Sequence, residues 1–206
     1  MTQALLTKPK RQERLITYEE FLEWSGENQH VEWVDGQVIP LSPVNLTHAT
    51  LSGFLFALIR TFVDAKDRGV VLYEPFNKTT GPTLPGRSPD VLFVDNSHLD
   101  RIVRNHLRGP ADLVVEVVSP DNPKRDRVEK LAEYETGGVQ EYWLIDPQKK
   151  EAIFYNLGSD GKYHITPLAN GIFNSIALNG LWIDIAWLFG VRMPSSIDIF
   201  KRWGLV

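Results

Sequence analysis

A glutamate stands inside a valine-rich run that predicts a buried β-strand. Glu116 lies in the middle of Leu113–Val118, and the alternation of side chains along a strand puts it on the same face as Val114 and Val118. An unpaired carboxylate at such a place costs on the order of several kcal/mol or becomes protonated. Glu116 therefore needs a metal ion, a lysine or an arginine beside it. A structural ion pair or a protonated glutamate explains the pattern as well as a functional group does.

A second acid stands at the start of another apolar run. Asp90 follows Pro89 and precedes Val91–Val94. If the two strands are neighbours, Asp90 and Glu116 can lie side by side at one strand end. Two carboxylates there could share a Mg²⁺ ion, which takes one or two protein carboxylates and keeps water as its other ligands. Taken alone, Pro-Asp is also a common turn pair.

Three polar residues recur at helical spacing after the Glu116 strand. Asp126, Lys130 and Tyr134 are spaced i, i+4, i+8, so they share one face of a helix, from which Lys130 could reach the two carboxylates. A lysine beside a metal ion can orient water or stabilise negative charge on a phosphate. Considered by itself, the Asp126–Lys130 spacing favours an ordinary ion pair on the helix surface.

The elements that must position these residues follow from patterning. Thr17–Glu20 is a capping box that starts a short helix, Asp35-Gly36 predicts a β-hairpin, and Asn45 or Thr47 caps a long amphipathic helix that reaches about Lys66. Further strands are expected at 70–73, 89–94, 113–118, 139–146, 151–157, 162–168 and 172–177, with helices at 123–136 and near 183–189. Residues 95–110 look polar and loop-like. The order of elements predicts an α/β fold with a mixed sheet flanked by helices.

Composition removes several classes of protein. The chain has 206 residues, no cysteine, 22 Lys and Arg, 26 Asp and Glu and a net charge of −4, which excludes disulfides, cysteine nucleophiles and thiolate metal sites. An acidic chain is not coated for non-specific nucleic-acid binding. No run approaches about 18 apolar residues, so we expect no membrane helix. The basic start lacks a hydrophobic segment, which predicts a cytoplasmic protein without a secretory signal.

The ordered motifs resemble a known family. They are Val31-Glu-Trp-Val-Asp-Gly36, His48, Arg87-Ser-Pro-Asp-Val-Leu-Phe-Val94, Ala111–Pro120, and Asp126, Lys130, Tyr134, Gly138-Val139 and Glu141-Tyr-Trp143. In this order they are similar to the Uma-type family of bacterial endonucleases within the PD-(D/E)XK nuclease superfamily. The resemblance spans roughly residues 17–190.

The resemblance implies a restriction-endonuclease-like core and a metal-dependent phosphodiesterase. It makes Asp90 and Glu116 ligands of Mg²⁺ or Mn²⁺. The superfamily's lysine normally lies two residues after the glutamate, where this chain has Val118, so Lys130 is the expected substitute. Glu32 is the candidate for a further acid, although it could equally pair with a basic neighbour. His48 and Tyr134 are supporting candidates that could instead be structural.

Basic residues near these motifs are candidate nucleic-acid contacts. Arg101, Arg104 and Arg108 would form one face if their segment were helical, and Lys124 and Arg125 lie at a predicted helix start. A solvated helix face is the alternative for both groups. We expect residues 1–14 to form a frayed or disordered tail, 15–192 a nuclease-like domain, and 193–206 a segment that packs on the core or on a partner.

The predicted function is endonuclease activity on nucleic acid, with DNA as the expected substrate. The shifted lysine and the acidic composition keep a second interpretation open, a catalytically silent module with the same fold that binds nucleic acid or a protein. The apolar end of the chain, residues 197–206, also allows a homodimer. Convergence of Asp90, Glu116 and the Lys130 amine in one cleft would favour the enzyme.

Overall fold

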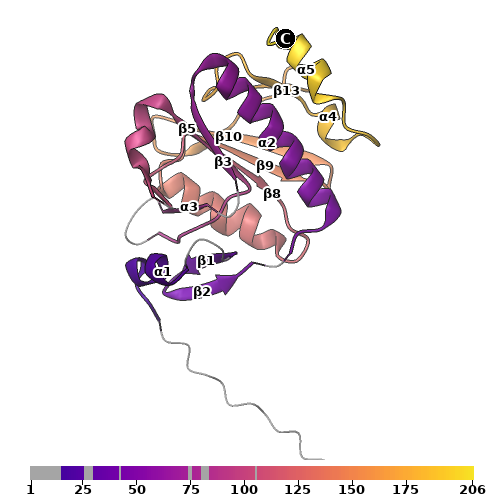
Figure 1. Ribbon diagram of the computed structural model, residues 1–206. Coiled ribbons are helices and arrows are strands. Elements are labelled where there is room, and N and C mark those ends of the chain that lie inside the picture. The colour runs from indigo at the N-terminus through magenta and orange to yellow at the C-terminus, as the bar shows by residue number, and fades with distance from the viewer. Residues whose placement is uncertain (1–14, 26–29, 42, 74–75, 80–83, 105) are drawn as a thin grey trace, which may run out of the picture.

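A mixed six-stranded sheet forms the centre of the computed structural model, which describes residues 15–25, 30–41, 43–73, 76–79, 84–104 and 106–206 (Figure 1). Its strands are β3 (Gly69–Tyr73), β5 (Val91–Asp95), β8 (Leu113–Val117), β9 (Glu141–Asp146), β10 (Glu151–Leu157) and β11 (Tyr163–Ile165). They lie in the order β11-β10-β9-β8-β5-β3. Strands β8 and β9 are parallel and the other neighbours are antiparallel. The predicted α/β class with a mixed sheet is confirmed, while the predicted tail, residues 1–14, lies outside the described residues.

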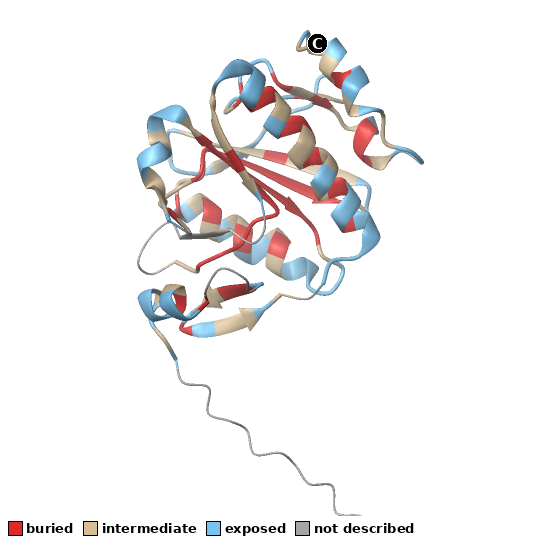
Figure 2. Cartoon of the chain, in the orientation of Figure 1, coloured by how far each residue is buried: buried red, intermediate tan, exposed pale blue. Residues whose placement is uncertain are grey.

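Side chains alternate between two cores, one on each face of the sheet. In β5, Val91 and Phe93 belong to one hydrophobic cluster, and Leu92 and Val94 belong to the other. Helix α2 (Leu46–Lys66) covers the first face, and helix α3 (Lys130–Thr136) lies on the second (Figure 1). Every residue of β8 and β9 is buried, as the red central strands in Figure 2 show. Burial on both faces explains why these strands are rich in apolar residues, apart from Glu116 in β8 and the acids at the two ends of β9.

Helix α2 begins and ends where the sequence predicts. The Oδ1 atom of Asn45 accepts a hydrogen bond from the His48 N–H at 2.9 Å, which makes Asn45 the cap. Among the described residues, α2 is long and apolar enough to cross a membrane by length and composition, with a mean hydropathy of 1.4. One such helix is weak evidence, since core helices pass the same test. Its buried face, including Leu55 and Leu58, packs on the sheet.

The crossover between β8 and β9 carries the predicted polar stripe. Asn122 caps the helix, because its Oδ1 accepts the Arg125 N–H at 3.2 Å. The helix starts at Pro123 as predicted, but Arg125–Glu129 form a π-helical turn in which the Lys130 N–H bonds to the Arg125 carbonyl. Such turns are rare and occur often at functional sites. The spacing of residues in the sequence does not reveal this turn.

The predicted N-terminal helix and hairpin are also confirmed. The capping box of Thr17 and Glu20 starts α1 (Tyr18–Ser25) through two reciprocal hydrogen bonds of 2.8 and 3.1 Å. Strands β1 (Val31–Val34) and β2 (Gln37–Pro40) are joined by Asp35 and Gly36, which have φ of 50° and 83°. Two positive φ values suit the tight turn that Asp-Gly favours. In Figure 1 these elements lie at the α3 side of the domain.

The expectation of a loop over residues 95–110 is wrong. A 3₁₀ helix covers Asn96–Arg101, and β6 (Ile102–Val103) and β7 (His106–Arg108) form a small sheet with β4 (Asn77–Thr79). Leu107, which is fully buried, anchors this sheet to the core. A strand of three residues with one buried side chain is too short to produce a readable period.

The C-terminal part adds a two-stranded sheet and two short helices. They are β12 (Ile172–Asn174), β13 (Trp182–Asp184), α4 (Ala186–Phe189) and α5 (Ser196–Arg202). The helix expected from residue 183 therefore begins later, because 182–184 pair with β12. Helix α5 packs on α2 through the buried Ile199 and through Trp203, whose ring lies 5.6 Å from that of Phe62. Nothing in this packing tests the predicted homodimer.

Candidate active site

Asp90 and Glu116 lie at the same end of two neighbouring strands. Val91 pairs with Val115 across the antiparallel strands β5 and β8. Asp90, one residue before Val91, therefore faces Glu116, one residue after Val115. The Asp90 Oδ2 atom accepts the Val117 N–H at 2.6 Å. Asp90 and Glu116 are 6% and 2% exposed and line the same cleft. Adjoining strands thus bring the two predicted acids together.

Both oxygens of Glu116 have protein partners. The Lys130 Nζ lies 2.8 Å from Oε2, and the Tyr134 hydroxyl donates to Oε1 at 2.6 Å. Burial raises the pKa of Glu116, and the nearby carboxylates of Asp90 and Asp126 add to this effect while Lys130 opposes it. The pattern is that of an acidic cluster with too little positive charge around it.

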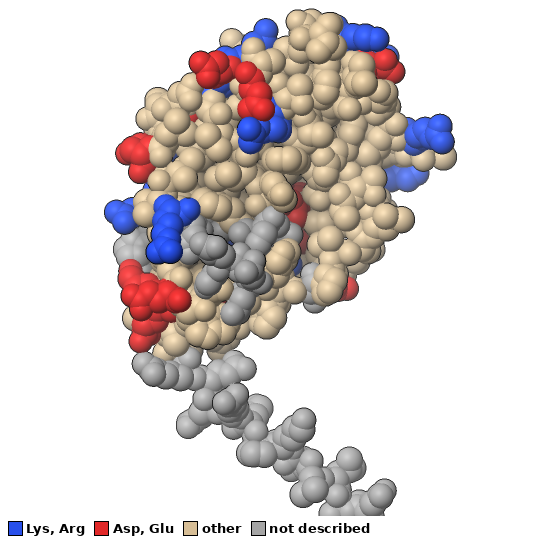
Figure 3. Space-filling view, in the orientation of Figure 1, with Lys and Arg blue, Asp and Glu red and all other residues tan. Residues whose placement is uncertain are grey.

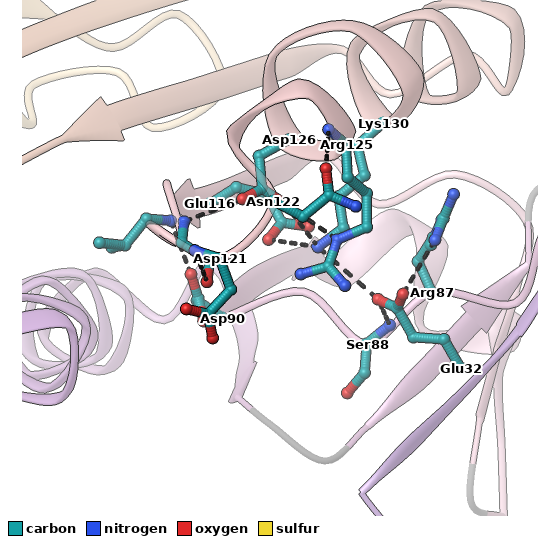
Figure 4. Close-up of polar contacts among 12 residues, drawn as sticks. Glu32, Arg87, Ser88, Asp90, Glu116, Asp121, Asn122, Arg125, Asp126 and Lys130 are labelled. Carbon is teal, nitrogen blue, oxygen red and sulfur yellow. Dashed lines mark hydrogen bonds and ion pairs between the residues drawn. The ribbon is translucent and has the colours of Figure 1, made fainter. Parts of the chain in front are cut away.

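Lys130 is the centre of this cluster (Figure 4). Its Nζ also lies 3.5 Å from Asp126 Oδ1 and 3.6 Å from Glu32 Oε1. Burial alone would lower the pKa of Lys130, but the carboxylates of Glu116, Glu32 and Asp126 outweigh it and raise the pKa. Lys130 is therefore an ammonium ion at neutral pH and cannot act as a proton acceptor.

The interpretation of Asp126 and Lys130 as an ordinary surface pair is wrong. They are 1% and 3% exposed, because this face of the helix packs over the end of β8. Asp126 Oδ2 also accepts the Ser119 N–H at 2.9 Å and so ties the strand end to the helix. Asp126 also lines the cleft. Its place on the predicted polar face of the helix did not indicate this position.

Glu32 reaches the cleft from the hairpin. It is fully buried, and its Oε2 accepts from Arg87 Nη1 at 2.9 Å while its Oε1 accepts from the Ser88 N–H at 3.3 Å. Although burial opposes it, the positive charges of Lys130 and Arg87 lower the pKa of Glu32. Glu32 thus lines the cleft, as expected for a further acid of the site, and it also pairs with a basic neighbour, as the alternative interpretation expects.

Arg87 is the residue that sequence reasoning missed. Besides Glu32 it binds Glu133, with contacts of 2.7 and 2.6 Å from Nε and Nη2. It is 3% exposed and thus links the hairpin to the helix that carries Lys130. The only signal for it was its place directly before Ser-Pro-Asp, which also fits an ordinary loop arginine.

His48 contacts Asp90 from helix α2. Its Nε2 is 3.3 Å from Asp90 Oδ2, and the side chain is buried at the first turn of α2. Tyr134 is likewise buried, and it touches Glu116 rather than the open cleft. His48 therefore contacts Asp90, and Tyr134 contacts Glu116 outside the lining of the cleft.

The predicted basic contacts separate into two groups. The helix that would place three arginines on one face does not form, since Arg101 ends a 3₁₀ helix, Arg104 stands in a turn with φ of 38°, and Arg108 is in β7. Arg101 Nη1 is engaged by the Pro110 carbonyl at 2.8 Å. At the helix start, Arg125 lines the cleft, while Lys124 is exposed outside the lining.

The cleft has a volume of about 420 Å³. Its titratable lining residues are Glu32, His48, Asp90, Glu116, Asp121, Arg125, Asp126 and Lys130. Five carboxylates thus face two permanent cations. Within the described part of the chain no group of three or more His, Cys, Asp or Glu side chains is arranged to hold a metal ion, so any cation here would depend on two carboxylates and water.

The chain is similar to known proteins in sequence and in fold. Residues 18–186 match the model of the Uma2 family, which is described as "Putative restriction endonuclease". A solved structure of a "putative nuclease belonging to DUF820" from Anabaena variabilis is similar, with a TM-score of 0.71 at 20% identity, over 84% of this chain and 97% of that one. No curated protein matches significantly. At that identity the solved structure shows a shared fold, and the family match over most of the chain shows that the protein belongs to the Uma2 family.

Proposed function

We propose that this protein is a divalent-metal-dependent endonuclease that hydrolyses phosphodiester bonds in nucleic acid, with DNA as the expected substrate. One observation carries the proposal: Asp90, Glu116 and Lys130 line one cleft in a chain that belongs to a family described as endonucleases. Two acids can hold a metal ion, and a buried ammonium ion can offset the negative charge that develops on an attacked phosphate.

The residues of the cleft fit a hard divalent cation. Asp90 and Glu116 offer oxygen ligands, which Mg²⁺ and Mn²⁺ prefer. The raised pKa of Glu116, caused by burial and by neighbouring acids, indicates a place where added positive charge is favourable. When bound, such an ion lowers the pKa of a bound water and offsets charge on the phosphate.

The protein's own groups hold this arrangement. The Val117 N–H fixes the Asp90 carboxylate at 2.6 Å, and Tyr134 fixes Glu116. Lys130 stays protonated because of its acidic neighbours, so it contributes positive charge beside the phosphate and does not remove a proton. Preorganised charge of this kind stabilises the charge that develops in the transition state.

Cleavage of plasmid and single-stranded substrates with Mg²⁺ or Mn²⁺ tests the proposal. We expect Asp90→Asn and Glu116→Gln to abolish cleavage. Lys130→Ala should reduce the rate by about 10²–10³, the usual cost of losing one preorganised charge donor. Asp160→Asn serves as the matched control, because Asp160 is an exposed acid paired with His164 far along the chain. Circular dichroism checks that each variant is folded.

The proposal fails if all three cleft variants keep the wild-type rate, or if cleavage is unchanged in EDTA. Reduced activity in the Asp160→Asn control would also contradict it, because this variant changes charge without touching the cleft.

A catalytically silent module remains the second candidate. Two observations favour it: Val118 occupies the usual lysine position, and both oxygens of Glu116 already have partners. Titration calorimetry with Mn²⁺ separates the two candidates. The enzyme predicts binding heat that disappears in Asp90→Asn, whereas the silent module predicts no binding that depends on Asp90.

A further inference from the structure

Two segments of the chain supply much of the lining of the cleft. Its floor is formed by the end of β8 and the start of the crossover helix, and its rim is formed by Leu41, Pro43 and Val44, between β2 and α2. Val44 is 47% exposed, so the rim presents apolar surface to the opening. A volume of about 420 Å³ lies in the range of small-molecule sites.

The reactive groups lie at the bottom of this space. Asp90, Glu116 and Lys130 are 6%, 2% and 3% exposed. A phosphate group must therefore be displaced from the regular path of the nucleic-acid backbone to reach these side chains. In a duplex, base pairing and stacking hold each nucleotide in place, and extruding one costs a few kcal/mol. An unpaired strand has no such constraint.

The charge distribution also disfavours a duplex. Duplex binding relies on many contacts from Lys and Arg to phosphates, but the net charge is −4. Among the described residues on the face in Figure 3, the Lys and Arg side chains stand apart and form no continuous stripe. The helix that would align Arg101, Arg104 and Arg108 does not form either, because these residues lie in a 3₁₀ helix, a turn and a strand. A short unpaired segment needs few phosphate contacts.

One guanidinium group is placed to make such a contact. The Arg125 side chain is 21% exposed, and its nearest carboxylate oxygen, Asp126 Oδ1, is 3.5 Å from Nε. Arg87 and Arg127, in contrast, have carboxylate contacts of 2.6–2.9 Å. The buried Nε of Arg125 makes no hydrogen bond. Figure 4 shows the guanidinium beside Lys130 at the cleft.

The π-helical turn explains this placement. It makes the Arg125 carbonyl the acceptor of the Lys130 N–H, five residues later. In a regular α-helix, neighbours on one face are three or four residues apart. The wider turn brings Arg125 and Lys130 to the same cleft. There they can contact two different phosphates, or they can contact two oxygens of the same phosphate.

We propose that the cleft takes single-stranded nucleic acid, with one unpaired nucleotide inside, Arg125 on a phosphate and Leu41, Pro43 and Val44 against the sugar or base. Single strands are held without sequence readout by side chains that pack on bases together with basic side chains on the backbone, and this cleft offers the apolar residues for the first role and Arg125 for the second. The inference rests on the proposed nuclease function and names its class of substrate.

Labelled oligonucleotides of one sequence test the inference. They are offered with Mn²⁺ as a single strand, as a blunt duplex and as a duplex with an unpaired overhang, in DNA and in RNA. We expect the single strand to be cut at least about tenfold faster than the duplex, and cuts in the third substrate to fall in its overhang. Arg125→Ala should raise KM by about tenfold or more, as for the loss of a charged hydrogen bond.

Arg60→Ala is the matched control, since Arg60 is an exposed arginine paired with Asp64 on α2. It should keep the wild-type KM. Equal or faster cleavage of the blunt duplex, or an unchanged KM in Arg125→Ala, overturns the inference.

A binding assay keeps this test separate from the proposed function. Fluorescence anisotropy with Asp90→Asn and Mn²⁺ measures affinity without cleavage. If no substrate is cut but the single strand binds more tightly than the duplex and requires Arg125, the nuclease proposal fails and the substrate class stands. If the duplex binds as well as the single strand, the inference is wrong.

Discussion

At the scale of residues, Glu116 shows how much a sequence can say about a site. Its place in a buried strand predicts a positive partner or a protonated carboxyl group, and the structure places the Lys130 Nζ at 2.8 Å. The sequence could not choose between metal, lysine and arginine, because the lysine lies 14 residues away. The direction in which the Lys130 side chain points depends on a π-helical turn, which no sequence pattern predicts. Arg87 was missed for a similar reason, since its partners Glu32 and Glu133 are distant in the chain.

The hydroxyl of Tyr134 offers a test at this scale. Tyr134→Phe removes the 2.6 Å hydrogen bond to Glu116 while it keeps the ring in the core. A hydrogen bond to a charged group contributes about 1.5–3 kcal/mol, so we expect a lower stability and a cleavage rate reduced by roughly tenfold. The rate follows because Glu116 loses the group that orients it. Urea unfolding and initial cleavage rates measure the two effects.

Tyr163→Phe is the control for this prediction. The Tyr163 hydroxyl donates to the Val139 carbonyl at 2.9 Å, away from the cleft. It should lose stability but keep its cleavage rate. Equal losses of rate in both variants would mean that Tyr134 only supports the fold.

At the scale of elements, the pattern of the sequence predicts the long strands and helices well and their connections poorly. Periodicity was sufficient for α2 and for the β8–α3–β9 crossover, because each buries a full stripe or face. The hairpin was predicted from Asp35-Gly36, but its position depends on the pairing of Trp33 with Gly86 and on the Glu32–Arg87 pair. Such long-range contacts leave no local signal.

The Arg87 linkage gives the element-scale prediction. Arg87→Met leaves the buried Glu32 without its closest cation, since Lys130 lies 3.6 Å away. Breaking one partner of a buried ion pair costs about 3–5 kcal/mol, so we expect a loss of that size in the free energy of unfolding. The exposed pair of Arg60 and Asp64 supplies the control, because Arg60→Met should cost less than about 1 kcal/mol.

A double variant separates charge from packing. Adding Glu32→Gln to Arg87→Met removes the uncompensated carboxylate, and part of the lost stability should return. If the double variant is as unstable as the sum of the two single variants, the hairpin is held by packing and the ion pair contributes little.

At the scale of the whole molecule, the shortest strands are the least predictable. Strands β4, β6, β7 and β13 have two or three residues each and give no usable period, although β12 lies within the strand expected at 172–177. The sequence did predict the class of fold and the order of the large elements. The cleft lies where the hairpin, α2 and the crossover helix meet the sheet, so its residues are drawn from 32 to 130 along the chain.

This dispersed network of acids predicts how stability depends on pH. Positive neighbours lower the pKa of Glu32, against the effect of burial. A carboxyl whose pKa is lower in the folded state than in the unfolded state, where it is about 4.3 for Glu, adds stability above the unfolded value. That stability disappears as the pH falls through the folded pKa. Asp95 and Asp146 have pKa values lowered in the same direction by hydrogen bonds to Ser97 and to Arg127.

We therefore expect stability to fall as the pH drops below about 4.5, where these carboxyls begin to take up protons preferentially in the unfolded chain. Glu32→Gln cannot gain this stability, so it should be less stable than the wild type at pH 7 and approach it as the pH falls. Urea unfolding between pH 3 and about pH 7 measures the gap. The exposed Glu23→Gln should follow the wild-type curve, and a gap for Glu32→Gln that stays constant with pH would show that the Glu32 charge does not stabilise the fold.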